Sequence, residues 1–401
     1  MQDLIDRLAA TDQAGSITRG LLFPYLNHAA SMFQSGYATR DDIDASMRFG
    51  CGYPIGPLAL IDEIGAAKVV GGLDALHAET GDPLHVPADV LKQLASRGKD
   101  FYAAAADGDA DHAIPQLKHE IRSVGVVGTG TMASGIVEVF AKAGYDVTYV
   151  GRDEDKVAGV AASIRKSLDK AISRGKLNDE GKAAVLGRLT GATSRDALAD
   201  ADIVVEAIAE DLDTKCELFK DLDRICKTGA ILATTTSSLS IADCAAVTAR
   251  PADLIGMHFF NPAPIMKLVE VVTADETSPD VAETVHALCL KIGKHPVSCS
   301  DRAGFIVNAL LFPYLNDAVK AHEAGAGSRE EIDAAMKDCK QPMGPFELLD
   351  VVGNDVSLAI QQRLVGSFGH DGWNPAASLE QVVADGHLGR KSGKGFHDYA
   401  S

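Results

Sequence analysis

The sequence predicts an α/β protein in which one sheet domain is flanked by two homologous all-α domains. Two observations predict this architecture: a seven-residue segment occurs unchanged near both ends of the chain, and short apolar runs alternate with helical stretches between the two copies. The length of 401 residues agrees with several domains, because a single domain usually spans about 100 to 200 residues.

The repeated segment is Leu-Leu-Phe-Pro-Tyr-Leu-Asn, at residues 21–27 and again at 310–316. Two further blocks recur in the same order, one at 43–45 and 332–334, the other, with substitutions, at 54–62 and 342–350. We therefore predict that residues 1–102 form a helical domain that is a copy of the C-terminal helical domain, residues 301–401. The shared segment is too apolar to face water and should fill much of each core.

Between the copies, residues 103–120 are rich in Ala and Asp and show no periodicity, which predicts a linker. Residues 121–300 contain apolar runs at 123–127, 203–205, 230–233 and 268–272, and these predict strands of a mostly parallel sheet. Residues 154–188 lack strand signals and carry Gly175 between two stretches rich in Lys and Ala. We interpret them as a helical hairpin inserted in the sheet domain.

The charge and the targeting signals narrow the function. A formal charge of -18 argues against nucleic acid as a partner, because most of the surface would repel a phosphate backbone. Seven cysteines without a CxxC pair fit reduced thiols, and no cluster of residues predicts a metal site. The N-terminus lacks the pattern of a signal peptide and no apolar run could span a membrane, so we expect a cytoplasmic protein.

A glycine-rich turn follows the first predicted strand and opens a helix. Its residues are Gly128, Gly130, Thr131 and Met132, with Ala133 at the third glycine position of the fingerprint. Gly128 permits the tight turn, Gly130 allows the backbone to approach a pyrophosphate, and the helix N-terminus supplies partial positive charge. The sequence therefore predicts a Rossmann-like dinucleotide-binding sheet domain with NAD(P) as cofactor.

The second strand decides between the two nicotinamide cofactors. The carboxylate that accepts the ribose 2'-hydroxyl is expected at its end, where the sequence has Gly151 followed by Arg152. A missing carboxylate and an added guanidinium favour a 2'-phosphate, so we expect a preference for NADP over NAD. In the alternative, Arg152 only stacks on the adenine and Asp153 serves the ribose.

Four blocks behind the dinucleotide fold carry the chemistry. They are Thr-Thr-Ser-Ser-Leu-Ser-Ile at 235–241, Gly-Met-His-Phe-Phe-Asn-Pro at 256–262, Met-Lys-Leu-Val-Glu at 266–270 and Gly-Phe-Ile-Val-Asn at 304–308. In this order they resemble the L-3-hydroxyacyl-CoA dehydrogenases of fatty-acid oxidation and butyrate metabolism. The resemblance covers residues 121–401 and departs at Thr235, where the family commonly has Asn.

The resemblance implies an active site. His258 would be the general base, which suits an imidazole because it accepts and returns protons near neutral pH. Glu270 would orient the ring and stabilise the imidazolium, while Ser237 and Asn308 would hold the reacting oxygen. The residues that the resemblance places at the cofactor, besides the glycine-rich turn and Arg152, are Glu210, Lys215, Ser237, Asn261 and Lys391. From the residues alone, Glu210 and Lys215 could equally be a solvated pair at a helix start.

The N-terminal copy has Arg19 at the position of Asn308 and no sheet domain before it, so it cannot form an active site. We expect it to pair with the C-terminal copy as an intramolecular pseudo-dimer, which gives a monomer or a domain-exchanged homodimer. The expected substrate is a short-chain 3-hydroxyacyl-CoA such as 3-hydroxybutyryl-CoA. Two alternatives are a related hydroxy-acid or sugar-acid dehydrogenase that does not use CoA, and a catalytically idle structural protein.

Overall fold

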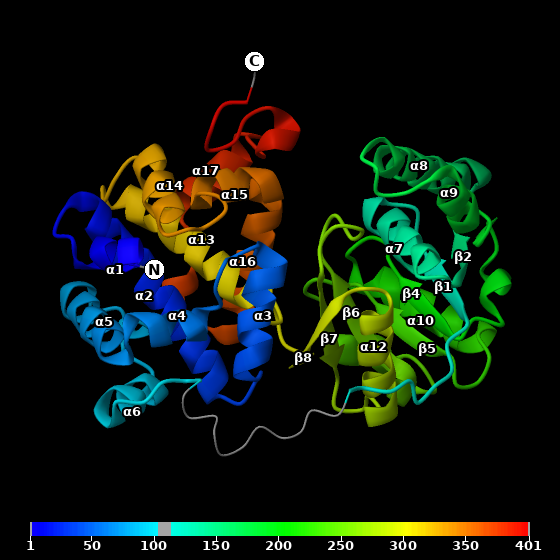
Figure 1. The fold of residues 1–401 in the computed structure, drawn as a ribbon, viewed down its shortest axis with the longest axis horizontal. Coiled ribbons are helices and arrows are strands. Elements are labelled where there is room, and N and C mark those ends of the chain that lie inside the picture. Colours follow the sequence, from blue (N-terminus) through cyan, green and yellow to red (C-terminus); the bar gives the residue numbers. More distant parts are fainter. Residues whose placement is uncertain (1, 103–113, 400–401) are drawn as a thin grey trace. The chain divides into compact units, whose positions relative to one another are not determined.

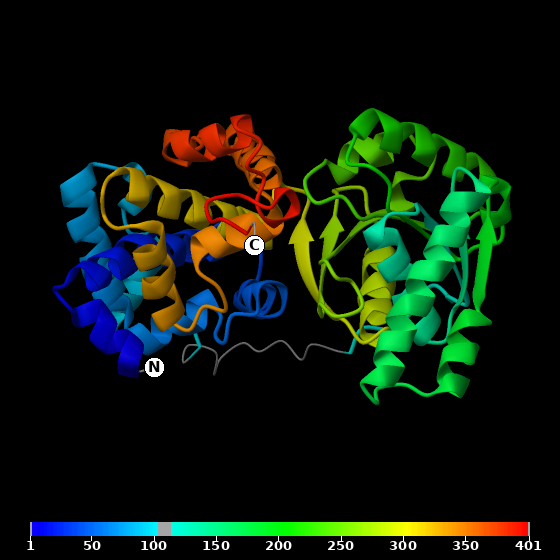
Figure 2. The ribbon, with the colours of Figure 1, turned by 90° about the horizontal axis from the view of Figure 1, so that it is seen from above.

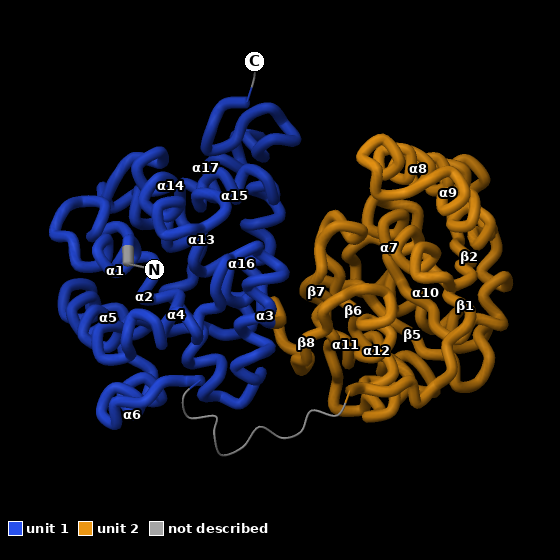
Figure 3. The backbone as a smooth tube through the Cα atoms, in the orientation of Figure 1, with its two compact units in different colours: residues 1–110, 306–401 blue, residues 111–305 orange. Residues whose placement is uncertain are grey.

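The computed structural model describes residues 2–102 and 114–399 of the chain. They form two compact units, one built from residues 1–110 and 306–401 (unit 1) and the other from residues 111–305 (unit 2) (Figure 3). Residues 103–113 of the predicted linker lie outside the described residues, and residues 114–120 contain no helix or strand.

Unit 2 is built on an eight-stranded mixed sheet in the order β3-β2-β1-β4-β5-β6-β7-β8 (Figure 1). The strands are β1 (Ser123–Val127), β2 (Asp146–Val150), β3 (Leu189–Ala192), β4 (Ile203–Glu206), β5 (Ile231–Thr234), β6 (Leu254–Phe259), β7 (Leu268–Thr273) and β8 (His295–Ser300). The first six are parallel, whereas β7 runs antiparallel to β6 and β8 runs parallel to β7. The reversal at β6 and β7 brings the end of one strand beside the middle of the next.

The helices that connect these strands are α7 (Thr131–Lys142), α8 (Glu154–Ser173), α9 (Asp179–Leu186), α10 (Leu212–Ile225), α11 (Ile241–Ala246) and α12 (Pro279–Lys291). Helix α7 packs on β1 and β2, and α12 packs on β6, β7 and β8. One cluster of buried side chains, including Phe140, Val205 and Met257, forms the core. The predicted helical hairpin is confirmed: α8 and α9 pack together and Gly175 in their connection has a φ of +68°, which favours glycine.

Unit 1 is helical in its named elements and takes residues from both ends of the chain, so blue helices lie among orange and red ones in Figure 2. Its N-terminal half contains α1 (Gln2–Ala9), α2 (Gln13–Gln34), α3 (Arg40–Cys51), α4 (Pro57–Ile64), α5 (Ala66–Thr80) and α6 (Asp89–Arg97). Its C-terminal half contains α13 (Val307–Glu323), α14 (Arg329–Asp338), α15 (Pro345–Val352), α16 (Asn354–Phe368) and α17 (Ala377–Ala384). Short 3-10 turns complete the two units at 83–85, 195–198, 251–253, 371–373 and 390–392.

The same hydrogen bonds recur in the two halves of unit 1. Asn27 accepts the N-H of Ala88 at 2.8 Å, and Asn316 accepts the N-H of Ala376 at the same distance. Asp44 and Asp333 each accept an N-H at 2.8 Å from the first turn of a helix that begins at the second Pro of a Pro-x-Gly-Pro sequence. Asp62 and Asp350 each accept the N-H groups of two consecutive residues near the end of their half. Residues at equivalent positions of the repeat thus make equivalent hydrogen bonds.

The two halves pack through α2 and α13, the helices that carry the repeated segment, whose residues are buried in both halves. The rings of Tyr25 and Tyr314, which occupy the same position of the segment, lie 5.8 Å apart. The two halves also share an ion pair, between Arg7 and Asp338 at 3.0 Å. Residues at equivalent positions of the segment thus lie next to each other where the two halves pack.

Candidate active site

The glycine-rich turn connects β1 to α7. A Cβ atom on Gly128, whose φ is +136°, would lie 2.2 Å from the carbonyl oxygen of Ala207, so no other residue fits there. Gly130 is the N-cap of α7, no side chain caps the helix, and apart from its chain neighbours no atom lies within 4 Å of its Cβ position. Thr131 is exposed and Met132 half-buried. Open space before an uncapped twelve-residue helix fits a pyrophosphate group.

The end of β2 has no room for a carboxylate. A Cβ atom on Gly151 would lie 2.7 Å from Cγ2 of Thr129 and 2.9 Å from Cγ2 of Val157. Arg152 is exposed, and Asp153 caps α8 by accepting the N-H of Lys156 at 2.8 Å. One oxygen of Asp153 is therefore already engaged in holding the helix that follows.

His258 and Glu270 form a buried pair on β6 and β7. They face each other in the antiparallel register, and Nδ1 of His258 lies 2.6 Å from Oε2 of Glu270. The Glu270 side chain is fully buried and that of His258 is 9% exposed. A carboxylate at Nδ1 holds the proton on that nitrogen and leaves Nε2 as the basic atom.

Aromatic rings limit the movement of the imidazole. The ring centroids of Phe260 and Phe305 lie 4.6 and 5.6 Å from that of His258. Phe305 is fixed in a left-handed conformation with a φ of +48°. Asn261, assigned to the cofactor by the resemblance, follows β6 two residues after Phe259 and is exposed.

A second polar cluster lies where β4 and β5 end. Glu210 accepts hydrogen bonds from the N-H and the hydroxyl of Ser237, at 2.8 and 3.1 Å, and from the hydroxyl of Thr236 at 2.6 Å. Burial raises the pKa of the Glu210 carboxyl, but the hydrogen bond from Thr236 and the charge of Lys215 outweigh it, so the net pKa is lower than usual. Glu210 is therefore an anion near neutral pH and fixes Ser237.

Lys215 is not the solvated residue that one reading of the sequence allows. Its side chain is 1% exposed, and Nζ lies 2.5 Å from Oε1 of Glu206 and 3.5 Å from Oε2 of Glu210. Glu206, which the sequence analysis missed, is fully buried and also accepts the hydroxyl of Thr234 at 2.6 Å. A charged residue directly after the apolar run of β4 was the signal that could have found it.

The structure brings together two groups of predicted residues in unit 2: His258 with Glu270, and Glu210 with Lys215 and Ser237. Asn308 and Lys391 belong to unit 1. Asn308 is a buried residue of the first turn of α13, and Nζ of Lys391 lies 2.5 Å from Oδ1 of Asp355.

Arg19, the counterpart of Asn308 in the N-terminal half, is used structurally. Its guanidinium donates to the carbonyl oxygens of Leu8 and Ala10 at 2.9 and 2.5 Å. These bonds tie α2 to the end of α1.

Among residues 2–102 and 114–399, no group of three or more His, Cys, Asp or Glu side chains is arranged to hold a metal ion. Within the same part of the chain, none of the helices has the length and apolar character needed to cross a bilayer.

The sheet, its glycine-rich turn and the buried histidine-carboxylate pair define the class of protein. A Rossmann-type domain for a nicotinamide cofactor, with a buried histidine-carboxylate pair on the same sheet, is typical of an oxidoreductase.

The chain belongs to the 3-hydroxyacyl-CoA dehydrogenase family. Residues 123–302 match the NAD binding domain of that family. The C-terminal domain of the family matches twice, at residues 15–105 and at residues 304–399.

Several proteins of this family are similar to the chain. A 3-hydroxybutyryl-CoA dehydrogenase of Clostridioides difficile is 44% identical over 68% of this chain and 98% of its own length. The human mitochondrial hydroxyacyl-coenzyme A dehydrogenase is 42% identical over 70% of this chain and 91% of its own. The crystal structure of (S)-3-hydroxybutyryl-CoA dehydrogenase from Ralstonia eutropha, at 41% identity, superposes with a TM-score of 0.69 and covers 70% of this chain and 100% of that one.

Proposed function

We propose that the protein interconverts short-chain L-3-hydroxyacyl-CoA and 3-ketoacyl-CoA with His258 as the general base. The observation that carries this proposal is the buried pair of His258 and Glu270, with Nδ1 and Oε2 2.6 Å apart. The 3-hydroxybutyryl-CoA dehydrogenases among the relatives support the short acyl chain.

The pair can move one proton in each direction of the reaction. In oxidation, Nε2 of His258 accepts the proton of the 3-hydroxyl group as the C3-H bond breaks, and a bound nicotinamide supplies the hydride acceptor. Glu270 then faces an imidazolium and stabilises its charge, as the carboxylate of a hydrolase triad does. In reduction, the same Nε2-H returns its proton to the new alkoxide.

Ser237 and Asn308 are proposed to hold the reacting oxygen by hydrogen bonds. The hydroxyl of Ser237 lies 3.1 Å from Oε1 of Glu210, which determines where it points. Glu210, Lys215, Asn261 and Lys391 are proposed to line the cofactor site. Since Glu206 neutralises Lys215, the buried lysine positions Glu210 rather than attracting a phosphate.

For the cofactor we propose NADP(H) in preference to NAD(H). The support is the lack of space for a carboxylate at Gly151, the exposed guanidinium of Arg152 and the engagement of Asp153 in capping α8. A 2'-phosphate gains from the guanidinium and meets no carboxylate at position 151, and one oxygen of Asp153 is engaged by the N-H of Lys156.

We further propose that the two halves of unit 1 are copies of one domain, paired within the chain as an intramolecular pseudo-dimer. The support is the double match of the family's C-terminal domain and the recurrence of the hydrogen bonds of Asn27, Asp44 and Asp62 in the other half. The role of Arg19 in tying α2 to α1 fits a copy that serves structure alone.

One assay separates this function from its alternatives. The protein is mixed with acetoacetyl-CoA and NADPH or NADH, and absorbance is followed at about 340 nm; acetoacetate replaces the thioester in a parallel series. We expect turnover with acetoacetyl-CoA and its loss in His258→Gln. Turnover of the free acid alone would favour a dehydrogenase that does not use CoA, and absence of turnover with every substrate would favour a structural protein.

A further inference from the structure

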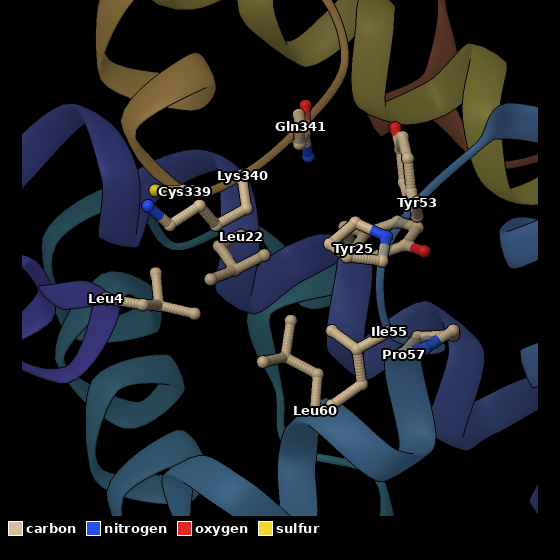
Figure 4. A pocket seen from close by; sticks show the side chains of 11 residues that line it. Leu4, Leu22, Tyr25, Tyr53, Ile55, Pro57, Leu60, Cys339, Lys340 and Gln341 are labelled. Carbon is tan, nitrogen blue, oxygen red and sulfur yellow. The ribbon is translucent and has the colours of Figure 1, made fainter. Parts of the chain in front are cut away.

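Unit 1 contains a cavity of about 260 Å³ where its two halves meet (Figure 4). Apolar side chains such as Leu22 and Leu60 make up much of its wall. The hydroxyl oxygens of Tyr25 and Tyr53 have no hydrogen-bond partner among the described residues, but a molecule in the cavity cannot reach them because surrounding atoms cover them. The cavity therefore identifies no ligand, and a buried cation in unit 2 is more informative.

Lys294 is a buried lysine that no step of the proposed reaction uses. It lies between α12 and β8 and is 8% exposed, and burial lowers the pKa of its ammonium group. Its Nζ donates to the carbonyl oxygens of Ala263 and Met266, at 2.5 and 2.7 Å. Within residues 2–102 and 114–399, no carboxylate forms an ion pair with it. Because an apolar side chain would fill the same space without burying a charge, these two hydrogen bonds are what the lysine contributes.

Both carbonyl groups belong to the β6–β7 loop, residues 260–267, which connects β6 to β7. Two N-H groups of the loop donate to the carbonyl oxygen of Pro262, at 2.9 and 3.0 Å, and close a turn. The turn does not use the carbonyl groups of Ala263 and Met266. Lys294 binds both of them, so one side chain joins the middle of the loop to its end.

The β6–β7 loop also packs on α7, the helix that begins at the glycine-rich turn. A Cβ atom on Gly135 of α7 would lie 3.1 Å from Cβ of Ala263 and 3.1 Å from Cδ of Pro264. Ala263 is 2% exposed. The loop is therefore held on α7 by close packing and on Lys294 by hydrogen bonds.

Both ends of the loop lead to residues of the candidate active site. Phe260 is its first residue, and the ring of Phe260 lies 4.6 Å from that of His258. Asn261 follows directly, and Glu270 lies three residues beyond the other end, opposite His258 in the register of β6 and β7. A shift of about 1 Å in a positioned group can lower a rate by about 10²-fold, so a movement of this loop matters for catalysis.

We propose that Lys294 is a positioning residue for the active site, which holds the β6–β7 loop where Phe260 and Asn261 are needed. This inference rests on the proposed function, in which His258 is the base and Asn261 lines the cofactor site. Lys294 acts through the loop, since its hydrogen bonds go to the backbone. Its loss should therefore weaken cofactor binding and lower kcat. The KM for the acyl-CoA should stay the same, because no residue of the loop is proposed to hold that substrate.

The test is Lys294→Met in the full-length protein, which removes the charge and both hydrogen bonds at a similar side-chain length. We expect kcat for the reduction of acetoacetyl-CoA to fall by about tenfold or more, with KM within about twofold of the parent value. The Kd of the reduced cofactor, from fluorescence titration, should rise by about fivefold. Hydrogen exchange followed by mass spectrometry should become faster in peptides from residues 260–267 and stay unchanged in β1 and β4.

Lys291→Met is the matched control, because Lys291 is the exposed last residue of α12, three positions before Lys294. It should give the parent values in every measurement. A folded Lys294→Met with the parent kcat and cofactor Kd would overturn the proposal. Faster exchange throughout the sheet would also overturn it, because Lys294 would then stabilise the whole domain rather than the loop.

Two further arms keep the inference testable. If Lys294→Met fails to fold, Lys294→Gln replaces it: the amide keeps N-H donors without the charge, and values equal to the parent's would again overturn the proposal. If the parent protein does not reduce acetoacetyl-CoA, the proposed function fails. Hydrogen exchange of the loop and the cofactor titration would still decide the role of Lys294, because neither requires turnover.

Discussion

Glu270→Gln is the substitution that best tests the proposed chemistry. The glutamine keeps an oxygen that can accept the Nδ1 proton of His258, so the ring orientation survives and the negative charge is lost. At the transition state of the oxidation, the charges of the His258 imidazolium and the Glu270 carboxylate would be centred about 4 Å apart. At an effective dielectric constant of about 20 this separation corresponds to about 4 kcal/mol for full charges. Because the imidazole carries only part of a charge at the transition state, we expect about 3 kcal/mol, or about 10²-fold in kcat.

Stopped-flow and steady-state measurements of the oxidation of 3-hydroxybutyryl-CoA would give kcat and KM separately, and fluorescence titration would give the Kd of the reduced cofactor. A charge effect lowers kcat and leaves both KM and that Kd within about twofold, whereas general damage to the site would alter all three. Glu276→Gln, on the exposed loop after β7, is the control and should be indistinguishable from the parent. If Glu270→Gln retains more than about a third of the parent kcat while folded, Glu270 does not stabilise the imidazolium.

Three other outcomes follow from the structure. Arg152→Ala should reduce kcat/KM for NADPH by about tenfold and leave that for NADH unchanged; equal values for both cofactors in the parent protein would contradict the proposed preference. Burial raises the pKa of Asp202, but hydrogen bonds from Lys227 and from the N-H groups of Arg122 and Ser123 lower the net pKa to about 2. The charge of Asp202 therefore stabilises the fold above pH 4, and this stabilisation is lost as the pH falls through 2. Asp202→Asn should therefore lower the free energy of unfolding by about 1 kcal/mol at pH 7 and by almost nothing at pH 2, as urea melts at both pH values would show. A chain beginning near residue 115 should dimerise or lose stability in analytical ultracentrifugation and thermal melts, and a stable, fully active monomer would contradict the proposed pairing within the chain.

Much of the sheet domain could be predicted because its signals are local. The runs at 123–127, 203–205, 230–233 and 268–272 correspond to β1, β4, β5 and β7, since continuous apolar segments are what buried strands require. Strand β8 was not predicted: it lies at the edge of the sheet, and its sequence His-Pro-Val-Ser-Cys-Ser buries only alternate positions.

The site was harder to predict from the sequence than the fold, because the contacts that form it join residues from separate segments. The contact of His258 with Glu270 depends on the antiparallel register of β6 and β7, which no single segment specifies. Glu206 escaped notice because its partner Lys215 lies nine residues further along the chain, across a loop. The lack of space at Gly151 depends on Thr129 and Val157, which reach it from two other segments.

Because unit 1 contains residues from both ends of the chain, it can be completed only late in synthesis. Arg7 and Asp338 form a contact across 331 residues, a stretch that takes a ribosome roughly 15 to 65 s at about 5 to 20 residues per second. Throughout that interval the face of α2 that packs on α13 stays uncovered, while all the strands of unit 2 emerge and can fold. The nascent chain therefore presents an apolar helix surface for the greater part of its translation, and we expect its yield in cells to depend on holding chaperones more than that of relatives without the N-terminal repeat.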